Sequence, residues 1–112
     1  MLIDMTQTDL QALRLVADQA SHLLRSLANP DRLLILCTLV QGECNVGELA
    51  QRSGIEQPTL SQQLTVLRRE ELIASRKEGK FVYYRLEHPD VLAVMQTLYG
   101  IFCAQGGTHD SD

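Results

Sequence analysis

The chain has 112 residues, of which 45% are hydrophobic, and a formal net charge of −4. This length is sufficient for one domain built around one core, and leaves no room for a second. The chain lacks an apolar run of about 18 residues and an N-terminal basic segment followed by an apolar core, which argues against a membrane span and an export signal. The sequence therefore predicts a single cytoplasmic domain over residues 1–112, ordered over about 8–104, with a disordered tail at 105–112.

The first predicted element is a long amphipathic helix. Residues 8–27 carry apolar side chains at helical spacing, which indicates one helix or two nearly continuous ones. The apolar face of a terminal helix can pack on the chain's own core or against a second subunit.

A second helix is expected after Asn29-Pro30-Asp31. Asn caps a helix, Pro fits its first position, and Asp meets the positive end of the helix dipole. Cys37 lies on the apolar face of this helix, and Gln41-Gly42 ends it.

Residues 46–69 are predicted to form a helix-turn-helix. Gly54 suits the left-handed position that ends a short helix over 46–53, and Pro58 suits the first turn of the next helix. The inner face of that second helix carries Leu60, Leu64 and Leu67. Its outer face carries amide, hydroxyl and guanidinium groups, which can reach base edges and phosphates but are also common on solvated surfaces. The expected DNA contacts are Gln57, Thr59, Ser61, Gln62, Gln63, Thr65, Arg68 and Arg69.

Two β-prone runs follow, residues 72–77 and 80–86, on either side of Glu78-Gly79, and together they predict a hairpin. A hairpin after a helix-turn-helix is a wing, in which Lys77 and Lys80 are expected to contact phosphates. The last helix is expected to begin at His88-Pro89-Asp90 and to end near Cys103.

The charge is unevenly distributed along the chain. Residues 57–86 hold six basic and three acidic side chains, a local charge of +3, whereas the remainder carries −7. A basic helix and wing on an acidic body can still neutralise phosphates, with low and salt-sensitive non-specific affinity.

The order helix, helix, helix-turn-helix, wing, helix, together with four short motifs, resembles the ArsR family of winged-helix repressors over about residues 10–104. The motifs are Asn29-Pro30-Asp31-Arg32-Leu33, Gln57-Pro58-Thr59-Leu60-Ser61-Gln62-Gln63-Leu64, Leu67-Arg68 and Tyr83-Tyr84-Arg85-Leu86. The resemblance implies a mainly α winged helix-turn-helix in the order α-α-α-α-β-β-α. It also implies a homodimer through the N-terminal and C-terminal helices that represses an operator in double-stranded DNA until an inducer arrives. Dimers usually read two half-sites about one helical turn apart, which favours pairing of the first helix with a second subunit.

Metal-sensing members of that family carry a Cys-x-Cys pair where this chain has Asn45 and Gly47, and residues 91–104 contain no His, Asp or Glu for the family's other site. A soft or borderline metal needs three or four close donors. The sequence therefore predicts no metal site and no cofactor.

Cys37 and Cys103 resemble the dithiol of the BigR, SqrR and HlyU branch of the family. The resemblance implies that persulfides, other reactive sulfur species or oxidants link the two cysteines within a subunit and release the operator. Spacing alone instead favours two small buried hydrophobic residues.

Cys44 competes with this assignment. It precedes a predicted N-cap at Asn45, where the helix dipole can lower the pKa of a thiol, whereas Cys103 lies at a helix C-terminus. The dipole argument thus nominates Cys44 as the more reactive thiol, although we assign the switch to the pair that the resemblance implies.

Two other functions remain open: a metal-responsive ArsR-type repressor with an unrecognised site, and a winged-helix module that binds protein. An enzyme such as a small thiol oxidoreductase is disfavoured, because the chain has no Cys-x-x-Cys motif, no Gly-rich phosphate loop and no nucleophile-base motif. A steep salt dependence of duplex binding would distinguish DNA from protein partners.

Overall fold

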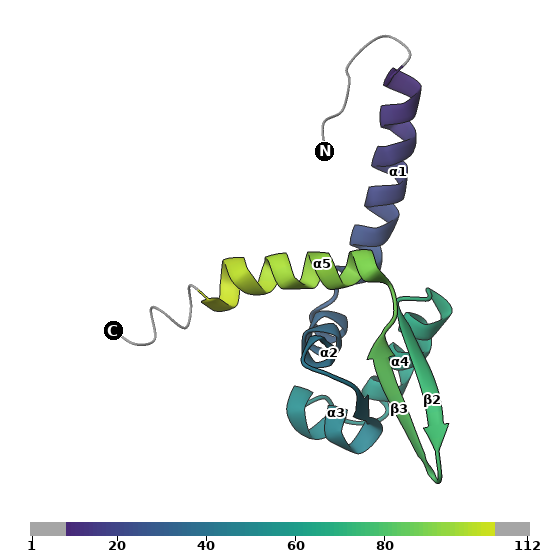
Figure 1. Ribbon diagram of the computed structural model, residues 1–112, viewed down its shortest axis with the longest axis vertical. Coiled ribbons are helices and arrows are strands. Elements are labelled where there is room, and N and C mark those ends of the chain that lie inside the picture. The colour runs from purple at the N-terminus through teal and green to yellow at the C-terminus, as the bar shows by residue number, and fades with distance from the viewer. Residues whose placement is uncertain (1–8, 105–112) are drawn as a thin grey trace.

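The computed structural model describes residues 9–104 of the chain. Its elements, in order, are α1 (Asp9–Leu27), α2 (Pro30–Val40), β1 (Cys44–Asn45), α3 (Val46–Ser53), α4 (Thr59–Arg69), β2 (Ile73–Glu78), β3 (Phe81–Leu86), α5 (Pro89–Leu98) and a π-helix, η1 (Tyr99–Ala104). The mainly α winged helix-turn-helix is therefore confirmed (Figure 1). The predicted tail at 105–112 lies outside the described residues.

The ends of the central helices follow from local chemistry. The side chain of Asn29 accepts a hydrogen bond of 3.0 Å from the amide of Arg32, which caps α2 ahead of Pro30. Asn45 and Glu48 form a reciprocal capping box at the start of α3, with both hydrogen bonds at 2.9 Å. Gly54 ends α3 with φ at 76°, a left-handed conformation that glycine adopts without steric cost.

The core lies where α2 meets α3, α4, α5 and β3. Each of these helices contributes aliphatic side chains at helical spacing, and burial of these side chains removes apolar area from water. Fully or almost fully buried residues include Ile35, Leu36, Leu39, Leu49, Leu60, Leu64, Leu67, Val91 and Met95. The core thus holds α4 with its outer face turned to solvent.

The wing is part of a three-stranded antiparallel sheet with the order β1-β3-β2. Glu78 pairs with Phe81, so the turn is Gly79-Lys80, one residue later than predicted. Sequence analysis missed β1, whose two residues are too few to show an alternating pattern; Cys44 pairs with Tyr84 and Asn45 with Tyr83. This short strand joins the wing to the connection between α2 and α3.

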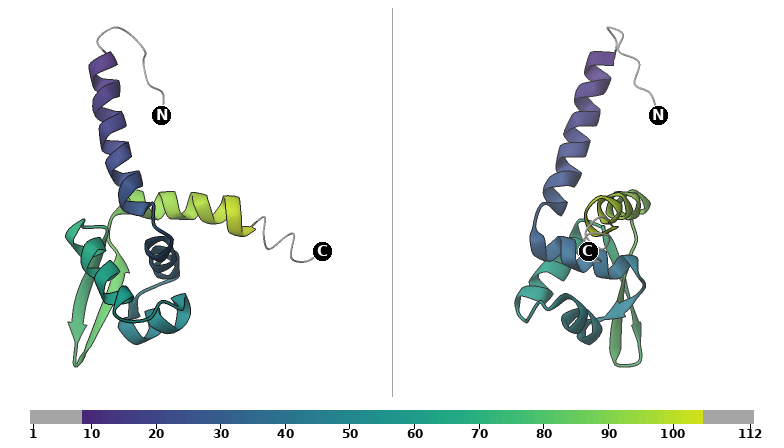
Figure 2. Two further views of the ribbon diagram at one scale, coloured as in Figure 1. Left: turned by 180° about the vertical axis from the view of Figure 1, so that it is seen from behind. Right: turned by 90° about the vertical axis from the view of Figure 1, so that its left-hand side faces the viewer.

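Helix α1 is a single helix that projects from the rest of the chain (Figures 1 and 2). Near its C-terminal end, His22 Nε2 lies 3.2 Å from Glu70 Oε1, and Leu27 is buried. On the same helix, Leu10 and Leu24 are more than half exposed. None of the helices within residues 9–104 is long and apolar enough to cross a membrane.

Helix α5 begins after His88, whose ring Nδ1 accepts a hydrogen bond of 3.2 Å from the amide of Asp90. At Tyr99 it passes into η1, which sequence analysis did not anticipate. The side chains of Tyr99, Ile101 and Phe102 are exposed, so this end of the chain also presents apolar surface to solvent.

Candidate DNA-binding interface and cysteine sites

Helix α4 separates its apolar and polar side chains as predicted. Its three leucines face the core, whereas Ser61, Gln62, Thr65, Arg68 and Arg69 are exposed and Thr59 is half-buried. The exposed groups combine amide, hydroxyl and guanidinium donors on one helix, which is the chemistry that base edges and phosphates require.

Some predicted contacts already have partners within the chain. Gln57 Oε1 accepts hydrogen bonds from the Ser61 amide (3.0 Å) and from Ser61 Oγ (2.6 Å), so this side chain closes the first turn of α4, which Pro58 leaves without a side-chain cap. Thr65 Oγ1 donates to the carbonyl oxygen of Ser61 at 2.9 Å. Of the amides on the helix, Gln62 is exposed and has the freedom to reach a base.

Gln63 differs from its neighbour because it is half-buried and bound to α2. Its Oε1 accepts a hydrogen bond of 2.9 Å from Arg32 Nε, and Arg32 Nη1 donates to the carbonyl oxygen of Ser26 at 3.0 Å. Arg32 therefore connects three helices. Sequence analysis missed this role because the partners of Arg32 are 6 and 31 residues away along the chain.

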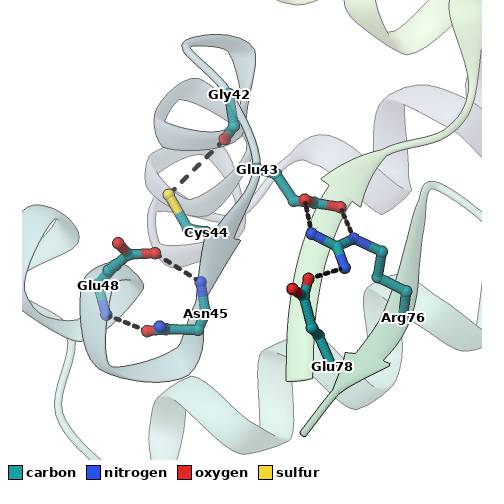
Figure 3. A network of polar contacts seen from close by, with 7 residues as sticks. All are labelled: Gly42, Glu43, Cys44, Asn45, Glu48, Arg76 and Glu78. Carbon is teal, nitrogen blue, oxygen red and sulfur yellow. Dashed lines mark hydrogen bonds and ion pairs between the residues drawn. The ribbon is translucent and has the colours of Figure 1, made fainter. Parts of the chain in front are cut away.

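The wing carries four cations, of which Arg76 and Arg85 form ion pairs. Lys77 and Lys80 are exposed, and Lys80 Nζ lies 5.7 Å from the centre of the Phe81 ring. Arg76 is held by Glu43 and Glu78 (Figure 3). The exposed lysines are positioned for the phosphate contacts that the sequence predicts.

A cavity of about 340 Å³ lies between α4 and the wing. It is lined by Leu64, Thr65, Arg68, Arg69 and Tyr84. The two arginines from the last turn of α4 thus line the same cavity as Tyr84 of β3.

The environment of Cys44 does not favour the lowered thiol pKa that the dipole argument predicted. Cys44 is fully buried, its Sγ donates to the carbonyl oxygen of Gly42 at 3.7 Å, and it accepts a hydrogen bond of 3.4 Å from Arg52 Nη1. Burial raises the pKa of the Cys44 thiol above its usual value, despite the opposing effect of Arg52. Burial therefore acts against the reactivity that the dipole argument assigned to Cys44.

Cys37 is half-buried against the core, on the last turns of α2. Cys103 falls within η1, which continues α5, but its side chain lies outside the described part of the structure. The pairing of Cys37 with Cys103 therefore remains a prediction. Among the residues whose positions are described, no group of three or more His, Cys, Asp or Glu side chains could hold a metal ion.

Comparison with known proteins places this geometry in a family. The family model described as "Bacterial regulatory protein, arsR family" matches residues 29–75, from the cap of α2 into β2. The biofilm growth-associated repressor of Xylella fastidiosa (strain 9a5c) is 48% identical over 89 residues, which cover 80% of this chain and 78% of that protein. The chain belongs to the ArsR family. As a member, it is a DNA-binding transcriptional regulator and not an enzyme.

Other ArsR-type relatives extend the similarity over most of the chain. The transcriptional activator HlyU of Vibrio cholerae is 40% identical over 95 residues, which are 85% of this chain and 88% of HlyU. The crystal structure of the repressor BigR from Xylella fastidiosa superposes with a TM-score of 0.78 at 45% identity, covering 85% of this chain and 94% of BigR. Reduced HlyU from Vibrio cholerae gives a TM-score of 0.79 at 40% identity, covering 83% and 98%.

Proposed function

We propose that this protein is a homodimeric transcriptional repressor that binds operator DNA through α4 and the wing and leaves it when Cys37 and Cys103 become linked. The observation that carries the proposal is the exposed polar face of α4 beside the wing lysines, supported by core packing on the opposite side. In this interface Gln62 reads a base edge, and Arg68, Arg69, Lys77 and Lys80 bind phosphates.

The proposed homodimer rests on apolar surface that residues 9–104, the described part of the chain, leave uncovered. Leu10 and Leu24 on α1, and Ile101 and Phe102 on η1, are between 46% and 69% exposed. Exposed apolar patches of this kind mark protein interfaces, and an isologous interface would place two α4 helices on successive major grooves of a near-palindromic site.

The release step rests on where the two cysteines lie in the chain. Cys37 is on α2, which packs against α4 and α5, and Cys103 is on η1, which continues α5. A covalent link between α2 and η1 would change how the proposed interface helix sits under the DNA-reading unit. Among the relatives, BigR is described as a repressor, and the description of one HlyU structure names a reduced state.

The proposed chemistry is thiol-disulfide exchange with a polysulfide. One cysteine thiolate attacks a polysulfide sulfur, which breaks an S–S bond and expels a shorter sulfide. The second cysteine then displaces hydrosulfide from the resulting persulfide, and the two cysteines have together given two electrons to the polysulfide. With a coupling typical of allosteric effects, linkage would weaken operator binding by about 5- to 150-fold.

The test is duplex binding before and after polysulfide treatment. The probe is a duplex that the wild-type protein selects from a random-sequence pool, and Cys44→Ser is the control. Cys37→Ser and Cys103→Ser should each bind the duplex and fail to release it, whereas Cys44→Ser should behave as wild type. Release of the Cys103→Ser protein at the wild-type polysulfide concentration would rule out the dithiol mechanism. Release by zinc would favour a metal-responsive repressor, and binding to protein but not to duplexes would favour an interaction module.

A further inference from the structure

In addition to the pairing of β1 with β3, the side chain of Arg76 links the wing to the body of the domain. From β2, its Nε donates to Glu43 Oε2 at 2.9 Å and its Nη2 to Glu43 Oε1 at 2.8 Å (Figure 3). Glu43 precedes β1, on the connection between α2 and α3. A two-point contact between guanidinium and carboxylate fixes orientation as well as distance, because both groups are planar.

The rest of the Arg76 guanidinium is also occupied. Nη1 donates to Glu78 Oε1, and the guanidinium carbon lies 4.8 Å from the centre of the Tyr83 ring. Each of its three nitrogens thus has a carboxylate partner, and one face lies over an aromatic ring. Little of this cation remains available to a phosphate, unlike the exposed amino groups of Lys77 and Lys80.

Both members of the pair are charged at neutral pH. The hydrogen bonds from Arg76 hold the pKa of Glu43 below its usual value, and the two carboxylates raise the pKa of Arg76 above its usual value. Exposed ion pairs stabilise folds only weakly. The Glu43–Arg76 pair is therefore expected to contribute more to the orientation of the wing than to the free energy of unfolding.

We propose that the Glu43–Arg76 ion pair is a positioning contact that holds the wing in its DNA-binding orientation, so that Arg76 serves the DNA interface through Glu43 and not through a phosphate. This inference rests on the proposed DNA-binding function. It assigns to an acidic residue outside the recognition helix a favourable effect on binding to a polyanion.

Because the proposal predicts that Glu43 favours DNA binding, Glu43→Gln tests it. If electrostatics alone mattered, removing a negative charge near the interface and freeing Arg76 would strengthen DNA binding. If the ion pair positions the wing, Glu43→Gln should weaken binding to the selected duplex by about 3- to 10-fold, measured as the dissociation constant by fluorescence anisotropy at fixed salt.

Glu78→Gln is the matched control. It removes the same charge and a hydrogen bond to the same guanidinium, but Glu78 lies on β2 itself and does not connect the wing to the body. This variant should bind the duplex at least as tightly as wild type. Hydrogen exchange provides the structural readout: amides of β2 and β3 should exchange faster in Glu43→Gln and at the wild-type rate in Glu78→Gln.

Two further variants distinguish positioning from phosphate contact. Arg76→Gln loses both the charge and the two-point geometry, and if Arg76 contacts no phosphate it should weaken binding without changing the slope of log affinity against log salt. Arg76→Glu should weaken binding more, and adding Glu43→Arg should restore affinity to within about threefold of wild type.

The outcomes separate this inference from the proposed function. Wild-type binding to the duplex combined with unchanged or tighter binding by Glu43→Gln would overturn the positioning role and leave the DNA-binding proposal intact. A salt slope that falls by about one in Arg76→Gln would reassign Arg76 to phosphate contact. A wild-type protein that binds no duplex would overturn both proposals.

Discussion

Helices α1 and α4 carry the same kind of sequence pattern and have opposite environments. On α4, Leu60 and Leu67 are fully buried, whereas on α1 Leu10 and Leu24 are 65% and 59% exposed. Leucines at helical spacing predict that a helix has an apolar face, but they do not say which chain covers that face. The comparison shows that α4 is held by its own domain, whereas the described residues leave much of the apolar face of α1 exposed, and the proposed dimer would cover that face.

The largest expected effect is on α4. Leu60→Ala removes a fully buried side chain and leaves a cavity under the recognition helix. The free energy of unfolding should fall by about 2–5 kcal/mol, measured by urea denaturation. A loss of stability below about 1 kcal/mol is typical of a surface position. That result would mean that the packing of α4 on its own core does not distinguish it from α1.

A charge on the exposed face of α1 should act on assembly. Leu24→Glu would place a carboxylate in the proposed dimer interface and weaken dimerisation by about 2–4 kcal/mol, measured by sedimentation at several concentrations. Gln11→Glu adds the same charge to the polar face of α1 and should leave the dimer intact. If Leu24→Glu sediments as wild type at every concentration, α1 does not form the interface.

Two adjacent glutamines on α4 are expected to have different roles, one in DNA binding and one in stability. Gln62→Ala should cost about 1–3 kcal/mol of binding to the selected duplex, and less on random DNA, because its exposed amide is free to pair with a base. Gln63→Ala should instead lower the free energy of unfolding by about 1 kcal/mol, because it removes the acceptor of Arg32 Nε. If Gln62→Ala weakens binding to the selected duplex and to random DNA equally, Gln62 contacts the DNA backbone and not a base.

The smallest expected effect concerns the wing tip. Lys80→Ala removes an exposed cation beside the turn, and the slope of log affinity against log salt should flatten by about one. Binding to all duplexes should weaken alike, since a phosphate contact carries no base information. An unchanged slope would remove Lys80 from the interface.

Most of the fold could be predicted because its signals are local. The caps at Asn29 and Asn45, the glycine at the end of α3 and the leucines of α4 each act within a few residues. The exposed polar residues of α4 follow from the same periodicity.

What the sequence did not reveal depends on contacts between distant positions. Arg32 meets Gln63 and Arg76 meets Glu43 across 31 and 33 residues, and no local pattern specifies either pair. The environment of Cys44 was misjudged for the same reason, because its burial comes from packing and from pairing of β1 with β3, whereas the dipole argument considered only α3.

In the proposed dimer, Arg32 would also influence which operator spacing the protein can bind. Its guanidinium joins the carbonyl of Ser26, at the base of α1, to Gln63 on α4. In the proposed dimer, α1 forms the contact between the subunits and α4 enters the major groove. The angle between α1 and α4 would therefore determine the distance between the α4 helices of the two subunits. The spacing of an inverted repeat that this protein tolerates would then depend on a residue that touches no base.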